Sequence, residues 1–305
     1  MLHELGTFNL IRVLKSLALG NALKSKQSTQ EVNEKKVFLL ECIEVEQQKS
    51  RILLKQPTYA KRMLSQFGMV DCNATKYPME PKAQLHKDME GAPIDVTEYR
   101  STVGCLRYLL NTRPDLSYAI GMAIRYMEWP TAMHHKVVKQ IHRYLRGTIH
   151  FGLTYVKDPR EVNIFGYSDS DLAGDLNRRK STSGMAFYLN KNLVSWNLQK
   201  QKTVTLSSCE AEFMAATTAA YQLLWLRSFV SELTEMEPRP VTFFVDNKSA
   251  IALMKNPVFH GCSKHTDTRF HFIQECVEKG KMSRCTDQSI DRSEVSCYAS
   301  ATWYA

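Results

Sequence analysis

The stretch VNIFGYSDSDLAGDLNRRKSTSGMAFYL, residues 162–189, decides the fold of the second half of the chain. Its apolar start ends in Asp169, as expected for a strand with a carboxylate at its end. After a polar segment with Gly174, a second apolar run continues into NLVSWNLQ, residues 192–199. These two runs predict a β-hairpin that turns at Asn190–Asn192.

A long helical pattern follows this hairpin. It covers 205–233 and begins with a capping box, in which Ser207 is the cap and Glu210 stands three residues on. The run VTFFVDN, residues 241–247, predicts a short buried strand, and two further helices are expected over 248–256 and 267–280. The order β-β-β-α-β-α-α indicates an α/β domain, a mixed sheet with helices packed on it.

The first half of the chain, up to Gly147, has a mainly helical pattern instead. Residues 37–46 predict a strand and 49–56 its hairpin partner, whereas 71–97 predict a surface loop. Apolar residues recur at three-to-four spacing in segments that predict four helices: 57–69, 98–112, 114–128 and 131–147. Residues 150–156, beyond Gly147, predict a strand that we group with the second half.

Composition and charge narrow the class of protein. With 305 residues, 44% of them hydrophobic, the chain can bury the cores of two modest domains. A net charge of +9 favours a polyanionic partner such as nucleic acid, although general solubility charge explains it equally well. One helix carries a basic stripe, which is either a solvated face or a set of phosphate contacts: Lys136, Lys139, Arg143 and Arg146.

The cysteines and the hydropathy pattern indicate an intracellular protein. None of the 8 Cys forms a CxxC pair, and they are expected to be reduced thiols. No signal peptide is visible at the start, so secretion is not expected. The sequence has no run of about 18 apolar residues, so no membrane span is expected either.

Three carboxylates stand where a fold can bring them together. Asp169 and Asp246 each end an apolar strand, and Glu212 lies in the first turns of the long helix. A carboxylate at the end of a buried run is unfavourable unless it pairs or binds a metal. Together they would form a hard oxygen cluster suited to Mg²⁺ or Mn²⁺, although each Asp alone is also compatible with a turn or a cap. Asp171, two residues after Asp169, either assists such a site or forms a turn.

Three blocks of sequence resemble the RNase H domain of copia-type retrotransposons: residues 166–189, 194–216 and 243–273. They carry, in order, the Ser-Asp strand end, the RKSTSG turn, the SW-S-KKQ hairpin, the SS-EAE helix start and the DN-SAI segment of that family. The resemblance implies an RNase H-like mixed sheet flanked by helices over 149–292. It also implies that Asp169, Glu212 and Asp246 are catalytic, hold two Mg²⁺ or Mn²⁺ ions, and hydrolyse the RNA strand of RNA–DNA hybrids.

The family's fourth carboxylate is expected near the end of the chain. The fragment CTDQSID keeps an Asp-Gln-x-x-Asp spacing and nominates Asp291, but 293–305 do not resemble the family and are expected to be an unrelated tail. Two functions therefore stay open. One is an active ribonuclease H, and the other is a non-catalytic nucleic-acid-binding remnant of a decayed retroelement.

Upstream, the resemblance continues with the region between the polymerase and RNase H in four segments: 54–69, 77–85, 99–131 and 142–148. Residues 37–148 are therefore expected to be a mainly helical thumb/connection remnant of reverse transcriptase, and 1–36 match poorly. The chain contains no Asp-Asp pair, so the Tyr-x-Asp-Asp motif is missing and this chain alone is not expected to be a reverse transcriptase. In an intact element, the family implies other Pol products as partners and a cytoplasmic virus-like particle or the nucleus as the location.

The segment from His260 to Cys276 contains further candidate ligands. His and Cys in this segment are possible zinc ligands, but their spacing matches no CxxC or HxxxH scheme. Arg269 matches a position in the family's KH-D-R-HF block, and we expect it to contact nucleic acid or to pack within the fold.

Overall fold

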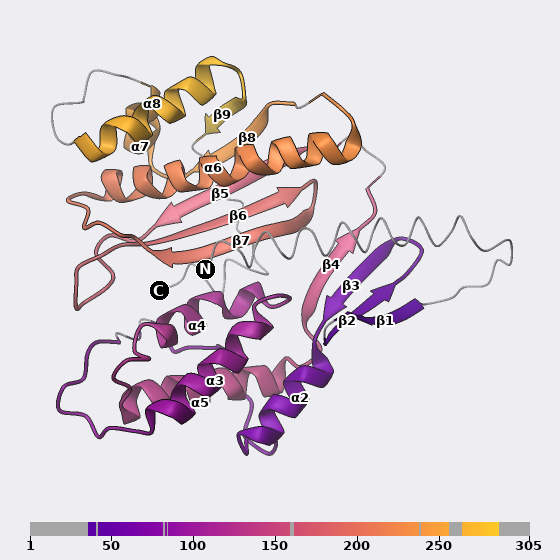
Figure 1. The fold of residues 1–305 in the computed structure, drawn as a ribbon, viewed down its shortest axis with the longest axis vertical. Coiled ribbons are helices and arrows are strands. Elements are labelled where there is room, and N and C mark those ends of the chain that lie inside the picture. Colours follow the sequence, from indigo (N-terminus) through magenta and orange to yellow (C-terminus); the bar gives the residue numbers. More distant parts are fainter. Residues whose placement is uncertain are drawn as a thin grey trace, which may run out of the picture. The chain divides into compact units, whose positions relative to one another are not determined.

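The computed structural model describes residues 36–40, 42–81, 83, 85–158, 162–237, 239–255 and 264–286. They form two compact units that divide between Lys157 and Asp158 (Figure 1). Asp291, His260 and Cys262 lie outside the described residues, as do 1–35 and 293–305. The thumb/connection character of the first unit and the nature of the two end segments stay predictions.

The first unit contains a four-stranded antiparallel sheet of β1 (Lys36–Leu40), β2 (Ile43–Gln47), β3 (Arg51–Lys55) and β4 (Gly152–Val156). The single strand predicted over 37–46 was wrong, because it is two strands joined by a tight turn. Cys42 has a φ of 65° there, in the left-handed region that non-glycine residues rarely adopt. Apolar residues stand on both sides of this turn, so the hydropathy pattern could not locate it.

Strand β4 was predicted correctly as a strand but was grouped with the wrong domain. It pairs antiparallel with β3, in a register that sets Leu153 against Leu54. Its local pattern is that of any half-buried strand, and the sheet that it joins depends on a partner about a hundred residues earlier in the chain. The boundary between the units therefore lies after Lys157 rather than at 148.

Helices build the rest of the first unit: α2 (Pro57–Gln66), α3 (Val96–Leu109), the 3-10 helix η1 (Pro114–Leu116), α4 (Ser117–Ile124) and α5 (Ala132–Gly147). All four predicted helical segments are confirmed, although 114–128 opens as a 3-10 turn and ends at Ile124. Gly68, with a φ of 64°, follows the C-cap of α2, where a left-handed glycine commonly ends a helix. The helices share one core, in which Tyr99, Leu106 and Ile141 are buried.

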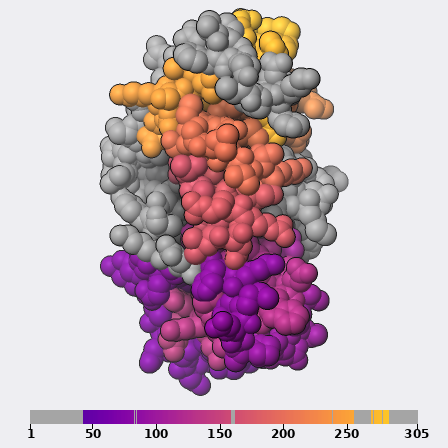
Figure 2. All heavy atoms as spheres, turned by 90° about the vertical axis from the view of Figure 1, so that its left-hand side faces the viewer, coloured from indigo at the N-terminus to yellow at the C-terminus, as the bar shows by residue number. Residues whose placement is uncertain are grey.

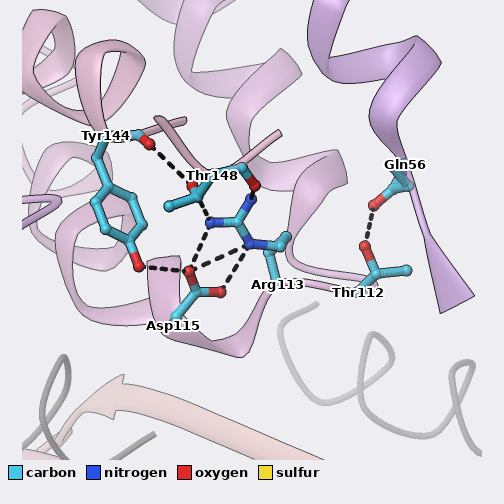
Figure 3. A network of polar contacts seen from close by, with 6 residues as sticks. All are labelled: Gln56, Thr112, Arg113, Asp115, Tyr144 and Thr148. Carbon is cyan, nitrogen blue, oxygen red and sulfur yellow. Dashed lines mark hydrogen bonds and ion pairs between the residues drawn. The ribbon is translucent and has the colours of Figure 1, made fainter. Parts of the chain in front are cut away.

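A buried polar network joins the loop after α3 to the end of α5 (Figure 3). The Arg113 guanidinium forms an ion pair with Asp115, with 2.6 Å between Nη2 and Oδ2. It also donates to Thr148 through Nη1 to the backbone oxygen at 2.8 Å and through Nη2 to Oγ1 at 2.7 Å. Tyr144 donates its hydroxyl to Asp115 Oδ2 at 3.0 Å. Each charge is thus compensated inside the fold.

The second unit is a five-stranded sheet of β5 (Ile164–Ser170), β6 (Thr182–Leu189), β7 (Asn192–Lys200), β8 (Val241–Val245) and β9 (Met282–Thr286). The order is β7-β6-β5-β8-β9, antiparallel between β7, β6 and β5 and parallel between β5, β8 and β9. The hairpin turn is at the predicted position, where Asn190 has a φ of 53°.

Three helices accompany this sheet: α6 (Ser208–Thr234), α7 (Lys248–Lys255) and α8 (Lys264–Glu278). The long α6 lies across one face of the sheet, and α7 and α8 lie on its side of the sheet (Figure 1). Its buried face includes Phe213, Leu223 and Leu226. The predicted mixed sheet flanked by helices is confirmed. Among the described residues, no helix has the length and apolar character needed to cross a membrane.

Candidate functional site

The three predicted carboxylates lie at one edge of the second sheet. Strands β5 and β8 are parallel neighbours, and Ser168 lies opposite Val245. Asp169 and Asp246 are the next residues along these two strands. The first turns of α6 reach the same edge, because the backbone N–H of Ser170 donates to Glu212 Oε1 at 3.1 Å. The parallel pairing and the start of α6 therefore bring together residues that are distant in sequence.

The half-buried Asp169 and the buried Glu212 form a carboxyl pair. Glu212 is only 6% exposed, and its Oε2 has no N–H partner among the described residues. The protonated Glu212 carboxyl instead hydrogen-bonds with the Asp169 carboxylate. Burial raises the pKa of Glu212 to about 9, and the negative charge of Asp169 adds to this rise. Burial also raises the pKa of Asp169. Two acids that resist ionisation side by side need a cation to become a stable pair of carboxylates.

Asp246 stands at the rim of this pair. It is exposed, and its charge contributes to the raised pKa of both Asp169 and Glu212. Within the described part of the chain, however, no three His, Cys, Asp or Glu side chains are gathered into a ready-made metal cluster. The adjoining Asp169 and Glu212 carboxyl groups, which have raised pKa values and offer only oxygen donors, nevertheless fit a hard divalent cation, with Asp246 beside them.

Asp171 forms a turn, the second of the two roles considered for it. Its Oδ1 accepts from the backbone N–H of Thr182 at 2.7 Å and from that of Gly174 at 3.4 Å. These bonds close the loop between β5 and β6. They hold the carboxylate in the loop immediately after Asp169.

A glutamine that the sequence analysis missed links the elements of the site. Gln201 is 8% exposed, and its Nε2 donates to Ser170 Oγ at 3.1 Å, Ser183 Oγ at 2.8 Å and the Ala211 backbone oxygen at 2.9 Å. It therefore ties β5 and β6 to the turn of α6 that carries Glu212. In the family resemblance it is only the last residue of the SW-S-KKQ block, and a Gln between two lysines otherwise suggests a surface residue.

The start of α6 is fixed by its cap. Ser207 Oγ accepts from the backbone N–H of Glu210 at 3.1 Å, which confirms the predicted cap. The Glu210 side chain accepts from the backbone N–H of Leu206 at 2.7 Å, one residue earlier than a capping box requires. The cap orients the first turns, on which Glu212 lies.

The predicted basic residues fall in two different environments. On α5, the four stripe residues are all exposed, as a common face requires: Lys136, Lys139, Arg143 and Arg146. Arg146 also donates through Nε to the Val70 backbone oxygen at 2.7 Å. Arg269 on α8 directs Nη1 to Met214 Sδ on α6 at 3.5 Å, which corresponds to the packing alternative. Of the possible zinc ligands, His271 is exposed and Cys276 is buried on α8.

Comparison with known proteins identifies the family. No protein-family model matches the chain. The chain is 36% identical over 240 residues to the retrovirus-related Pol polyprotein from transposon RE1 of Arabidopsis thaliana. The aligned region covers 79% of this chain and 16% of that protein. It is 37% identical over 238 residues to the corresponding polyprotein from transposon TNT 1-94 of Nicotiana tabacum, covering 75% of this chain and 18% of that protein. The chain belongs to the copia-type retrotransposon Pol polyproteins.

A shorter relative matches the chain over much of its own length. The uncharacterized mitochondrial protein AtMg00810 of Arabidopsis thaliana is 36% identical over 183 residues, which are 60% of this chain and 75% of that protein. By contrast, this copia-type chain spans only 16% and 18% of the two transposon polyproteins. Their activities as whole proteins therefore enter only as proposals.

Solved structures with a similar arrangement include RNase H domains. LC11-RNase H1, isolated from compost, has a TM-score of 0.32 and 16% identity, covering 46% of this chain and 95% of that chain. The foamy viral protease-reverse transcriptase in complex with dsDNA has a TM-score of 0.43 and 9% identity, covering 84% of this chain and 46% of that chain. Strand order, parallel pairing and family membership together make the second unit RNase H-like.

Proposed function

We propose that this retroelement protein is a ribonuclease H that hydrolyses the RNA strand of RNA–DNA hybrids. The observation that carries the proposal is the close pair of carboxyl groups on the half-buried Asp169 and the buried Glu212, at the edge where Asp246 also lies. Perturbed acids of this kind concentrate at functional sites. The family of the chain supplies the substrate class.

Asp169, Glu212 and Asp246 would hold two Mg²⁺ or Mn²⁺ ions. When bound, such ions activate water and neutralise charge on the leaving 3′ oxygen of a phosphodiester. The chain itself supplies the orientation. The Ser170 N–H holds Glu212 Oε1 in place, and Gln201 fastens the Glu212 turn to β5 and β6.

The test is cleavage of a hybrid with a labelled RNA strand in Mg²⁺ by the purified chain and by Asp169→Asn and Glu212→Gln variants. Each variant should lose at least about a hundred-fold in rate, because it removes a ligand that the transition state requires. Glu232→Gln is the matched control, since Glu232 is an exposed glutamate near the far end of the same helix. It should cleave like the parent.

Equal cleavage by the parent and by Asp169→Asn would assign the activity to a contaminant and end the proposal. Cleavage that persists in EDTA would also end it. Each protein is compared by circular dichroism, so that a loss of activity is not confused with a loss of fold.

A second candidate function is binding of nucleic acid without cleavage. The observation in its favour is that the described residues hold no gathered cluster of three ligands. A parent chain that binds the hybrid in Mg²⁺ but leaves it intact would support this function.

We also propose an intracellular location, which the free thiols of the described cysteines Cys42, Cys72, Cys105, Cys209 and Cys276 support.

A further inference from the structure

Two loops beside the carboxyl pair are joined into one surface. They are the β5–β6 loop, residues 171–181, and the β7–α6 loop, residues 201–206. Ser181 Oγ and Thr205 Oγ1 lie 3.0 Å apart in a hydrogen bond, and the Gln201 N–H donates to the Ser181 backbone oxygen at 2.8 Å. Lys180 Nζ donates to the backbone oxygen of Lys202 at 2.5 Å. The two loops are therefore held together by both side chains and backbone.

A buried aspartate shapes the tip of the first loop. Asp175 is 3% exposed, forms an ion pair with Lys200 on β7, and accepts through Oδ2 from the backbone N–H of Arg178 at 3.0 Å. Its backbone oxygen accepts from the Arg179 N–H at 2.7 Å, and Arg179 has a left-handed φ of 52°. Lys200 and Lys180 are thus used internally, and the loop is a built structure.

Three cations on these loops remain available to a partner. Arg178, Arg179 and Lys202 are exposed, and within the described residues their side chains make no hydrogen bond or ion pair. Large apolar side chains are exposed on the same two loops: Leu172, Leu176, Val204 and Leu206. Leu206 alone is 91% exposed. We call these seven residues the loop surface.

The loop surface adjoins the carboxyl pair. Ser170 pairs with Ser183 across β5 and β6, and the Asp171 N–H donates to the Thr182 backbone oxygen at 3.2 Å, so the first loop starts two residues after Asp169. Strand β5 ends toward the left of Figure 1, and this is the side that faces the viewer in Figure 2. A ligand at the carboxyl pair would extend over these loops.

We infer that the loop surface binds the sugar–phosphate backbone of a nucleic-acid duplex next to the carboxyl pair. Guanidinium groups pair with phosphate through two parallel hydrogen bonds, and free cations beside acidic residues complement a polyanion whose reacting bond lies at those acids. The exposed aliphatic side chains can cover the apolar edges of the sugars. The inference rests on the proposed function only for the identity of the duplex as an RNA–DNA hybrid. It does not require that the hybrid is cleaved.

The test is fluorescence anisotropy of a labelled RNA–DNA hybrid in EDTA, measured across a series of KCl concentrations with the whole chain. The double variant Arg178→Ala/Arg179→Ala should bind about ten-fold or more weakly, and the slope of log K against log salt should fall by about 0.9 for each phosphate that the variant no longer neutralises. Lys202→Ala should behave in the same way with a smaller effect. Arg178→Lys/Arg179→Lys, which keeps the charges, should restore most of the slope.

Lys191→Ala is the matched control, because Lys191 is an exposed cation in the β6–β7 turn at the opposite end of the same sheet. It should leave the slope unchanged. Equal affinity and slope for parent and double variant would overturn the inference, as would equal losses in Lys191→Ala or no binding by the parent. Since EDTA prevents metal-dependent cleavage, a chain that binds through these residues but never cleaves in Mg²⁺ refutes only the proposed nuclease. A chain that cleaves while the variants bind normally refutes only the loop surface.

Discussion

Replacement of His142 by Phe should remove much of the acid sensitivity of the first unit. His142 lies on α5, is 2% exposed, and interacts through Nδ1 with the Val138 backbone oxygen at 2.9 Å. Its Nε2 is buried without a partner among the described residues. Burial lowers the pKa of His142 to about 4, although the bond to Val138 opposes this and the charge of His135 adds to it. The ring is therefore neutral in the folded protein at neutral pH.

The direction of the pH effect follows from this pKa. Folding lowers it from 6.5 to about 4, so the unfolded chain takes up a proton at a higher pH than the folded chain does. The first unit is therefore expected to lose stability as the pH falls below about 6.5, with the full loss reached below about 4. With these two values the loss between pH 7.5 and pH 5 is about 2 kcal/mol.

Hydrogen exchange of peptides from α5, followed in increasing urea, measures the opening free energy of this unit separately from that of the second unit. The difference between parent and His142→Phe should change by about 2 kcal/mol between pH 7.5 and pH 5, in favour of the variant at the lower pH. His150→Gln, at an exposed position just after α5, is the control. A difference that does not depend on pH would show that His142 is not held neutral by burial.

Further predictions concern the buried network and the site helix. Asp115→Ala leaves the Arg113 guanidinium buried without its ion pair, and should lower the free energy of unfolding of the first unit by about 3 to 5 kcal/mol. The double variant Arg113→Met/Asp115→Leu should lose less free energy of unfolding than Asp115→Ala does. Hydrogen exchange of α5 peptides in urea compares the two variants. Equal losses in both would contradict the ion-pair argument. Ser207→Ala removes the cap of α6 and should cost about 1 kcal/mol, measured by exchange of peptides from that helix. Ser208→Ala, at the first position of α6, is the control. An equal loss of helix stability in this variant would refute the capping role of Ser207.

Local sequence was sufficient where the structure depends on neighbours a few residues away. The stop at Gly68, the turn at Asn190, the cap at Ser207 and the strand ending at Asp169 follow from backbone preferences and short-range hydrogen bonds. The family resemblance rests on the same blocks. It selected Asp169, Glu212 and Asp246, and the fold brings all three to one edge of the sheet.

Tertiary structure decided what depends on distant partners. Strand β4 joined the first sheet because β3 offered a matching edge, and Gln201 became a link within the site only once β5, β6 and α6 had surrounded it. The same is true of the raised pKa of Glu212, which arises from burial beside Asp169. Sequence alone determined the local elements and the identity of the acids. The burial of Glu212 beside Asp169, on which the proposed chemistry depends, exists only after packing has excluded water from this pair.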